Sequence, residues 1–218
     1  MRIVIAGGHG QIALRLERLL SARGDEVAGI IRNAEQGDDL GAAGAEPVLL
    51  DLESASVDEV AAVLRGADAA VFAAGAGPGS GTARKETVDK RAAVLFADAA
   101  VRAGVRRFVV VSSMGADPAH QGDEVFDVYL RAKGAADAYV TGQSGLDWTI
   151  LRPGALTDAP GTGLVRLEAH TGRGAVTRDD VAAVLAELVD TSATAGLTLE
   201  LIGGSAPVTV AVKSVAGN

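Results

Sequence analysis

The chain has 218 residues, of which 48% are hydrophobic and 22% are charged, a balance typical of one globular domain. Its net charge of −8 argues against binding to nucleic acid or to an anionic membrane surface, because both require a basic surface. The absence of cysteine excludes disulfides and thiolate nucleophiles, and the histidines lack the spacing of a zinc enzyme, so we expect no metal site. We find neither a signal peptide nor an apolar run of membrane-spanning length, and we expect a cytoplasmic protein.

Short apolar runs alternate with longer helical patterns over the first two thirds of the chain. The helical patterns cover residues 11–22, 57–64, 85–103 and 128–141. The apolar runs are almost continuous, as in strands buried on both faces of a sheet, and they cover residues 3–6, 27–31, 47–50, 69–73, 108–111 and 148–151. This alternation predicts an α/β fold with a doubly wound, Rossmann-type parallel sheet, in which ligands bind at the carboxyl ends of the strands.

The C-terminal part of the chain is less regular. Residues 152–163 contain prolines and glycines and are expected to form a loop, whereas residues 178–190 predict a helix with Thr177 as its N-cap. Residues 198–202 predict a last strand, and the tail at residues 206–215 has no clear assignment. Because we find no linker, we expect a single domain over residues 1–218, with a small substrate lobe beginning at about residue 153.

A glycine-rich loop directly follows the first predicted strand and opens the first helix. Its sequence, Gly7-Gly8-His9-Gly10-Gln11-Ile12-Ala13, has the pattern G-x-x-G-x-x-A. Gly7 would permit a tight turn, Gly10 would let a pyrophosphate approach the backbone at the helix N-terminus, and Ala13 would let the helix pack closely on the strand. The loop predicts dinucleotide binding, with His9 lining the phosphate site; the alternative is a plain tight turn.

The second predicted strand ends in Arg32-Asn33, at a position where an acidic residue would bind the ribose of NAD. A guanidinium group instead matches a 2′-phosphate, so Arg32 predicts a preference for NADP. The alternative is a solvated surface arginine in a protein that also accepts NAD. Asp51-Leu52 follows the third strand, where the acid would either meet the adenine amino group or simply begin a helix.

Tyr129 and Lys133 are four residues apart in a predicted helix and therefore share one face. An ammonium group one turn away favours the phenolate form of a tyrosine, which makes Tyr129 a candidate acid or base. Ser112 and Ser113 end a buried strand, where a hydroxyl could bind a substrate carbonyl. The alternative for Tyr129 is a ring packed in the core.

The motifs GGHGQIA, VFAAGAG, VVVSSMGAD, YLRAKGAADAYV and GLDWTILRPGALTD together resemble the short-chain dehydrogenase/reductase superfamily. The resemblance is closest to its atypical branch of small bacterial NAD(P)-binding proteins, which are epimerase/dehydratase-like or NmrA-like. It implies catalytic roles for Ser113 or Ser112, Tyr129 and Lys133. It departs from many relatives because residues 87–103 contain no asparagine. It also implies a cofactor path over Gly7, Gly10, Gln11 and Ile12, then Arg32, Asp51 and Leu52, then Ala73, Ala74 and Gly75, and on past Ser112, Tyr129 and Lys133 to Pro153.

These features predict an NADP(H)-dependent oxidoreductase that moves a hydride between the nicotinamide and a small carbonyl or alcohol substrate. Tyr129 would transfer the proton, Ser113 would orient the oxygen and Lys133 would tune the tyrosine. The alternatives are a non-catalytic NAD(P)-binding sensor, an epimerase or dehydratase, and a flavin or quinone reductase. The expected partner is a small molecule, and the protein itself is expected to be a monomer or a homodimer.

Overall fold

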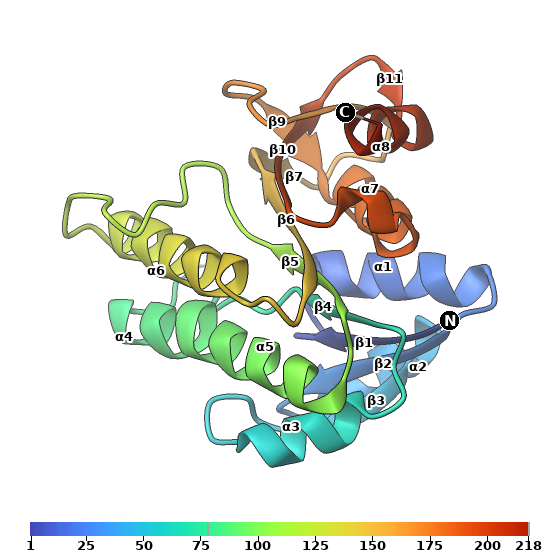
Figure 1. The fold of residues 1–218 in the computed structure, drawn as a ribbon, viewed down its shortest axis with the longest axis vertical. Coiled ribbons are helices and arrows are strands. Elements are labelled where there is room, and N and C mark those ends of the chain that lie inside the picture. Colours follow the sequence, from blue (N-terminus) through green and yellow to red (C-terminus); the bar gives the residue numbers. More distant parts are fainter. Residues whose placement is uncertain (78, 218) are drawn as a thin grey trace.

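The computed structural model describes residues 1–77 and 79–217, which form a nine-stranded sheet between two layers of helices (Figure 1). The strand order is β11-β8-β10-β6-β5-β4-β1-β2-β3. All neighbouring pairs from β10 to β3 are parallel, whereas β8 is antiparallel to both β10 and β11. The strands are β1 (Arg2–Ala6), β2 (Glu26–Ile31), β3 (Glu46–Leu49), β4 (Ala69–Phe72), β5 (Arg107–Val111), β6 (Asp147–Pro153), β8 (Leu164–Glu168), β10 (Leu197–Gly203) and β11 (Ala206–Pro207).

Helices cover both faces of the sheet, and each layer packs on its own apolar core (Figure 1). One layer consists of α1 (Gln11–Ala22), α7 (Arg178–Asp190) and α8 (Val208–Ala216). The other consists of α3 (Val57–Leu64), α5 (Ala92–Ala103) and α6 (Val125–Thr141). Across the described residues, every helix is too short or too polar to traverse a lipid bilayer.

The near-continuous apolar runs are explained by burial on both sides of the sheet. In β1, Ile3 and Ile5 belong to the core under α1 and α7, while Val4 and Ala6 belong to the core under α3 and α5. Successive side chains of a strand point to opposite faces, so a strand with two covered faces carries mostly apolar residues. The expected α/β, doubly wound fold is therefore confirmed.

The order of the strands creates a switch point between β1 and β4. The chain runs outward from β1 through β2 to β3, and then crosses to β4 on the opposite side of β1. The loops after β1 and β4 consequently diverge at the carboxyl edge of the sheet, where open α/β sheets bind their ligands. The glycine-rich loop follows β1 at this edge.

The predicted strands and helices of the first two thirds of the chain are confirmed, with one change in the helix expected at residues 85–103. That region begins with α4 (Thr82–Arg84), continues as a π-helical segment, η2 (Lys85–Arg91), and becomes α-helical only in α5. Single π-helical turns inside helices are frequent at functional sites. Lys85 and Asp89 of this segment are both buried.

The C-terminal predictions are confirmed only in part. The helix at residues 178–190 and its Thr177 N-cap are confirmed. The loop expected at residues 152–163 is wrong in part, because β6 extends to Pro153 and β7 (Ala155–Thr157) pairs with β9 (Ala175–Thr177) in a separate two-stranded sheet. Residues 198–202 are not the last strand, since the tail forms β11 and then α8. With two or three residues each, β7, β9 and β11 are too short to show a periodic pattern in the sequence.

Candidate functional site

A cavity of about 740 Å³ opens at the carboxyl edge of the sheet, over the switch point. All of the candidate site residues line it except Asn33, whose side chain accepts a hydrogen bond from Glu35 N and begins the short 3-10 helix η1 (Ala34–Gln36). The lining candidates are Gly7, His9, Gly10, Gln11, Ile12, Arg32, Asp51, Leu52, Ala73, Ala74, Gly75, Ser112, Ser113, Tyr129, Lys133 and Pro153.

The glycine-rich loop has the geometry of an anion-binding turn. Gly7 has a φ of +80°, and a Cβ at this position would lie 2.6 Å from Ala74 Cα, so any side chain would clash with the loop after β4. Gly10 N donates to Gly7 O at 2.8 Å, and α1 begins at Gln11 without a side-chain cap. The open N-terminal N–H groups of α1 therefore fit the pyrophosphate of a dinucleotide.

His9 connects the glycine-rich loop to the segment after β2 through two side-chain contacts. Its Nε2 lies 2.7 Å from Asp39 Oδ2, and its Nδ1 lies 3.1 Å from Gln36 Nε2. Both ring nitrogens are thus engaged, which supports a role for His9 in lining and fixing the loop rather than in proton transfer.

Arg32 is part of an ionic cluster at one end of the cavity. Arg32 and Arg84 donate to the same oxygen, Glu53 Oε2, at 3.1 and 2.8 Å, and the Thr87 hydroxyl donates to Glu53 Oε1 at 2.6 Å. The hydrogen bonds from Thr87 and Arg84 hold the pKa of Glu53 below its usual value. Glu53 and Arg84 were not among the candidates from the sequence, because their pairing depends on how the loop after β4 folds back.

The two serines after β5 have different environments. Ser112 is buried and donates to Asp137 Oδ2 at 2.8 Å, an oxygen that also accepts from Arg152 at 2.8 and 3.0 Å. Burial raises the pKa of Asp137, against the opposing effect of these hydrogen bonds. Ser113 donates only to Met114 O, at 3.2 Å, and its hydroxyl can turn toward a ligand more easily. The geometry thus favours Ser113 over Ser112 as the group that meets a substrate.

Lys133 lies deep in the wall between two loops of the cavity. Its Nζ donates to Val111 O at 3.0 Å and to Ala74 O at 3.4 Å, and it lies 3.6 Å from Asp89 Oδ1. Asp89 is fully buried, and its other oxygen accepts from Ala76 N at 3.3 Å. The lysine and Asp89 together link α6, η2 and the loop after β4. Asp89 was not among the candidates from the sequence, because its contact with Lys133 depends on how η2 packs beside α6.

Tyr129 is half-buried on α6 and faces the same cavity. Its ring stacks on Phe126, with centroids 5.8 Å apart, and the Lys85 ammonium lies 5.3 Å from the ring centroid. Lys133 makes no hydrogen bond to Tyr129; its Nζ instead contacts the two backbone carbonyls and Asp89. The Lys85 ammonium therefore lies beside the Tyr129 ring, a contact that sequence spacing could not reveal.

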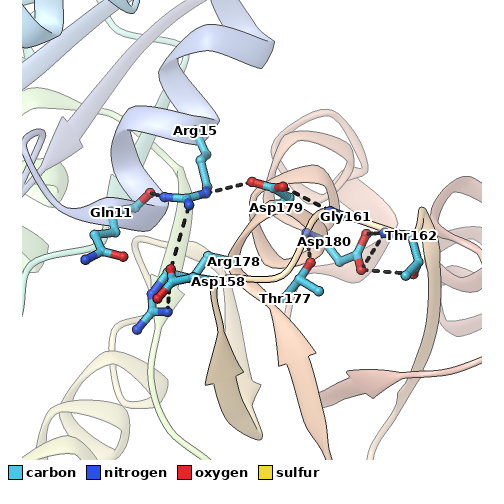
Figure 2. A network of polar contacts seen from close by, with 9 residues as sticks. All are labelled: Gln11, Arg15, Asp158, Gly161, Thr162, Thr177, Arg178, Asp179 and Asp180. Carbon is cyan, nitrogen blue, oxygen red and sulfur yellow. Dashed lines mark hydrogen bonds and ion pairs between the residues drawn. The ribbon is translucent and has the colours of Figure 1, made fainter.

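A network of charged groups connects α1 to the C-terminal lobe beside the cavity (Figure 2). Arg15 Nε donates to Asp179 at 2.6 Å, and Arg178, a lining residue, donates to Asp158 at 2.8 Å. Figure 2 also shows Asp180 accepting hydrogen bonds from Thr162, while Gly161 N donates to Asp179. These contacts link α1 to the start of α7 and to the segment at residues 158–163.

Replacing Asp180 with alanine should lower the free energy of unfolding by about 1–3 kcal/mol, because this buried carboxylate accepts from three donors of the exposed loop at residues 162–163. Although burial raises the pKa of Asp180, hydrogen bonds from Thr162 and Gly163 hold it below the usual 3.8. The stabilisation that ionised Asp180 provides is therefore present above pH 4, and it is lost as the pH falls through the lower pKa of the folded state. Urea unfolding measures the loss, with Asp179→Ala as a half-exposed control that should change stability by less than about 1 kcal/mol.

Comparison with known proteins finds relatives over nearly the whole chain. A family described as NAD(P)H-binding matches residues 7–192. The Bacillus subtilis protein named uncharacterized sugar epimerase YhfK is 37% identical over 216 residues, which cover 99% of this chain and 100% of that protein. The solved structure of a provisionally named NAD-dependent epimerase/dehydratase from Bacillus halodurans is 37% identical, covers 100% of both chains and has a TM-score of 0.90. The oxidoreductase ylbE from Lactococcus lactis is 29% identical, covers 100% of this chain and 98% of its own, and has a TM-score of 0.87.

Proposed function

This chain belongs to the NAD(P)H-binding family, and from that membership we propose that it is an NADP(H)-dependent oxidoreductase acting on a small carbonyl or alcohol substrate. The motif resemblance to the atypical short-chain dehydrogenases/reductases agrees with this membership. One observation carries the proposal: Ser113, Tyr129 and Lys133 line the same cavity as the glycine-rich loop. A proton donor thus shares the cavity with the loop that would seat a dinucleotide.

The cofactor would lie along the carboxyl edge of the sheet. The N-terminus of α1 would hold the pyrophosphate, and Asp51 and Leu52 would border the adenine. When bound, the nicotinamide supplies or accepts the hydride. Lys133 would fix the cavity wall beside it, because its ammonium already links the backbones of Ala74 and Val111.

The chain itself supplies proton transfer and orientation. Tyr129 donates the proton of its hydroxyl to the carbonyl oxygen as the substrate is reduced, and takes it back in the reverse direction. Ser113 donates a hydrogen bond to the same oxygen and so holds it within reach of Tyr129. The Phe126 ring, stacked on Tyr129, keeps the phenol in a fixed plane and covers it from water.

Arg32 supports a preference for NADP, because its guanidinium lines the cavity and can exchange Glu53 for a 2′-phosphate. The change Arg32→Glu should weaken NADPH binding about tenfold to a hundredfold and leave NADH binding nearly unchanged. Calorimetric titration of the purified protein with each dinucleotide measures both affinities.

The exposed Arg173, which does not line the cavity, provides the matched control, and Arg173→Glu should alter neither affinity. Equal affinities of the unchanged protein for NADPH and NADH would refute the preference, while leaving the oxidoreductase proposal intact. If the protein bound no dinucleotide, the proposal as a whole would fail. Net oxidation of NADPH by a carbonyl compound separates an oxidoreductase from an epimerase or dehydratase, whose cofactor returns to its starting state in each cycle.

A further inference from the structure

Lys85 is a buried cation that the proposed reaction does not use. It belongs to η2, lines the cavity and is 7% exposed. Its Nζ donates to Gly77 O at 3.0 Å and lies 5.3 Å from the centroid of the Tyr129 ring. An ammonium group has three donors, and only this one protein acceptor engages Lys85 in the part of the chain that the structure describes.

The other cationic side chains that line the cavity are each matched by a carboxylate. Glu53 accepts from both Arg32 and Arg84, Asp89 lies beside Lys133, and Asp158 accepts from Arg178. Within residues 1–77 and 79–217, Lys85 has no carboxylate within 4.0 Å. A buried ammonium without a counter-ion is unfavourable unless an anion completes its environment.

The cavity that Lys85 lines also carries exposed apolar side chains. Phe126 is 62% exposed, Val125 is 46% exposed and Leu156 is 39% exposed, and all three line the cavity. Val88, on the same segment as Lys85, also faces it. Exposed apolar side chains gathered around one cavity mark a surface that an apolar ligand would cover. A ligand that covers these side chains and also reaches Lys85 would have an apolar body and one anionic group.

We propose that Lys85 is the anion-binding residue of the substrate site, and that the substrates are apolar or aromatic carbonyl compounds that carry a carboxylate. This inference rests on the proposed function, because it places the substrate carbonyl at Tyr129. The protein has a net charge of −8, so an anionic substrate needs a local cation to bind here. Lys85 supplies that cation beside the tyrosine that would protonate the carbonyl.

The test compares 4-formylbenzoate with its methyl ester, which differ in the negative charge. Calorimetry on the complex of the protein with NADP⁺, in which no turnover occurs, measures the binding of each probe. We expect the unchanged protein to bind the acid about tenfold more tightly than the ester. Lys85→Met should abolish this preference, and Lys85→Arg should restore most of it. Lys90→Met, on the outer face of the same segment, should retain it, because Lys90 pairs with Glu86.

Four results would overturn the inference. The first is equal binding of acid and ester, or no binding of either. The second is a preference that Lys85→Met does not change, in a variant whose melting temperature shows that it is folded. The third is a large loss of NADPH affinity in Lys85→Met, which would assign the ammonium to the cofactor. The fourth is tighter binding of 4-formylphenyl phosphate than of the carboxylate, which would assign the site to phosphate esters.

The failure of the proposed function has a different signature. If the acid binds in a manner that depends on Lys85 but is never reduced by NADPH, the anion site stands and the oxidoreductase proposal falls. If NADPH reduces the acid and the ester equally well, the oxidoreductase proposal stands and the role of Lys85 falls.

Discussion

The Tyr129→Phe variant should lose turnover by a factor of about 10² to 10⁴ while binding NADPH within a few-fold of the unchanged protein. The hydroxyl is the only group removed, and the ring contacts to Phe126 and Lys85 can persist in phenylalanine. Because the tyrosine would act on the substrate oxygen, its loss should lower kcat far more than it alters KM. Steady-state oxidation of NADPH with an accepted carbonyl compound gives both constants.

Tyr139 offers a control on the same helix. Its hydroxyl donates to Asp98 at 2.6 Å, and neither residue lines the cavity. Tyr139→Phe should therefore leave kcat unchanged, although it removes the same atom from the same helix. Full turnover in Tyr129→Phe would exclude this residue as the proton donor. A protein that binds NADPH tightly, yet reduces no carbonyl, quinone or flavin before mutation, would support the sensor alternative.

The parts of the site that follow from local sequence could be predicted. Gly7 and Gly10 were recognisable because a tight turn between a strand and a helix imposes its own residue types. Tyr129 and Lys133 were recognisable because four residues bring side chains to one face of a helix. Such rules act over a few residues and do not depend on the rest of the fold.

The partners of these residues could not be predicted in the same way. Asp89 meets Lys133 only because η2 packs beside α6, and Glu53 meets Arg84 only because the loop after β4 folds back. The π-helical turns that bury Lys85 and Asp89 look like an ordinary helix in the sequence. The short C-terminal strands were not predicted for a related reason, since the residues of β7 pair with residues of β9 such as Ala155 with Ala175, beyond the reach of a local pattern.

Glu17 is a buried carboxyl group that no sequence pattern indicated. It lies on α1 with its side chain fully buried, and neither carboxylate oxygen has a hydrogen-bond partner among the residues that the structure covers. A Cβ on Gly29 would lie 2.6 Å from Glu17 Oε1, and one on Gly8 would lie 3.0 Å from it, so the carboxyl group fits against two glycine backbones. This burial raises the pKa of Glu17 from its usual 4.5 to about 8.

The raised pKa makes the stability of the protein depend on pH. Between pH 4.5 and about 8, Glu17 is protonated in the folded chain and ionised in the unfolded chain. The folded state then holds more protons, so the contribution of Glu17 is fully present below pH 4.5 and is lost as the pH rises to about 8. Across this range the unfolding free energy should fall by on the order of 5 kcal/mol, which is a large share of the stability of a typical domain.

Glu17→Gln removes the titration and keeps the shape of the side chain. We expect the variant to gain several kcal/mol in unfolding free energy relative to the unchanged protein as the pH rises from 5 to 9. Urea unfolding at pH 5, 7 and 9 measures the difference between the two proteins, so that groups common to both cancel. Glu46→Gln, at an exposed position of β3, should show no such trend. Parallel pH profiles for Glu17→Gln and the unchanged protein would mean that the carboxyl group is ionised in the fold. In that case water or a rearranged side chain must solvate it beneath the glycine-rich loop.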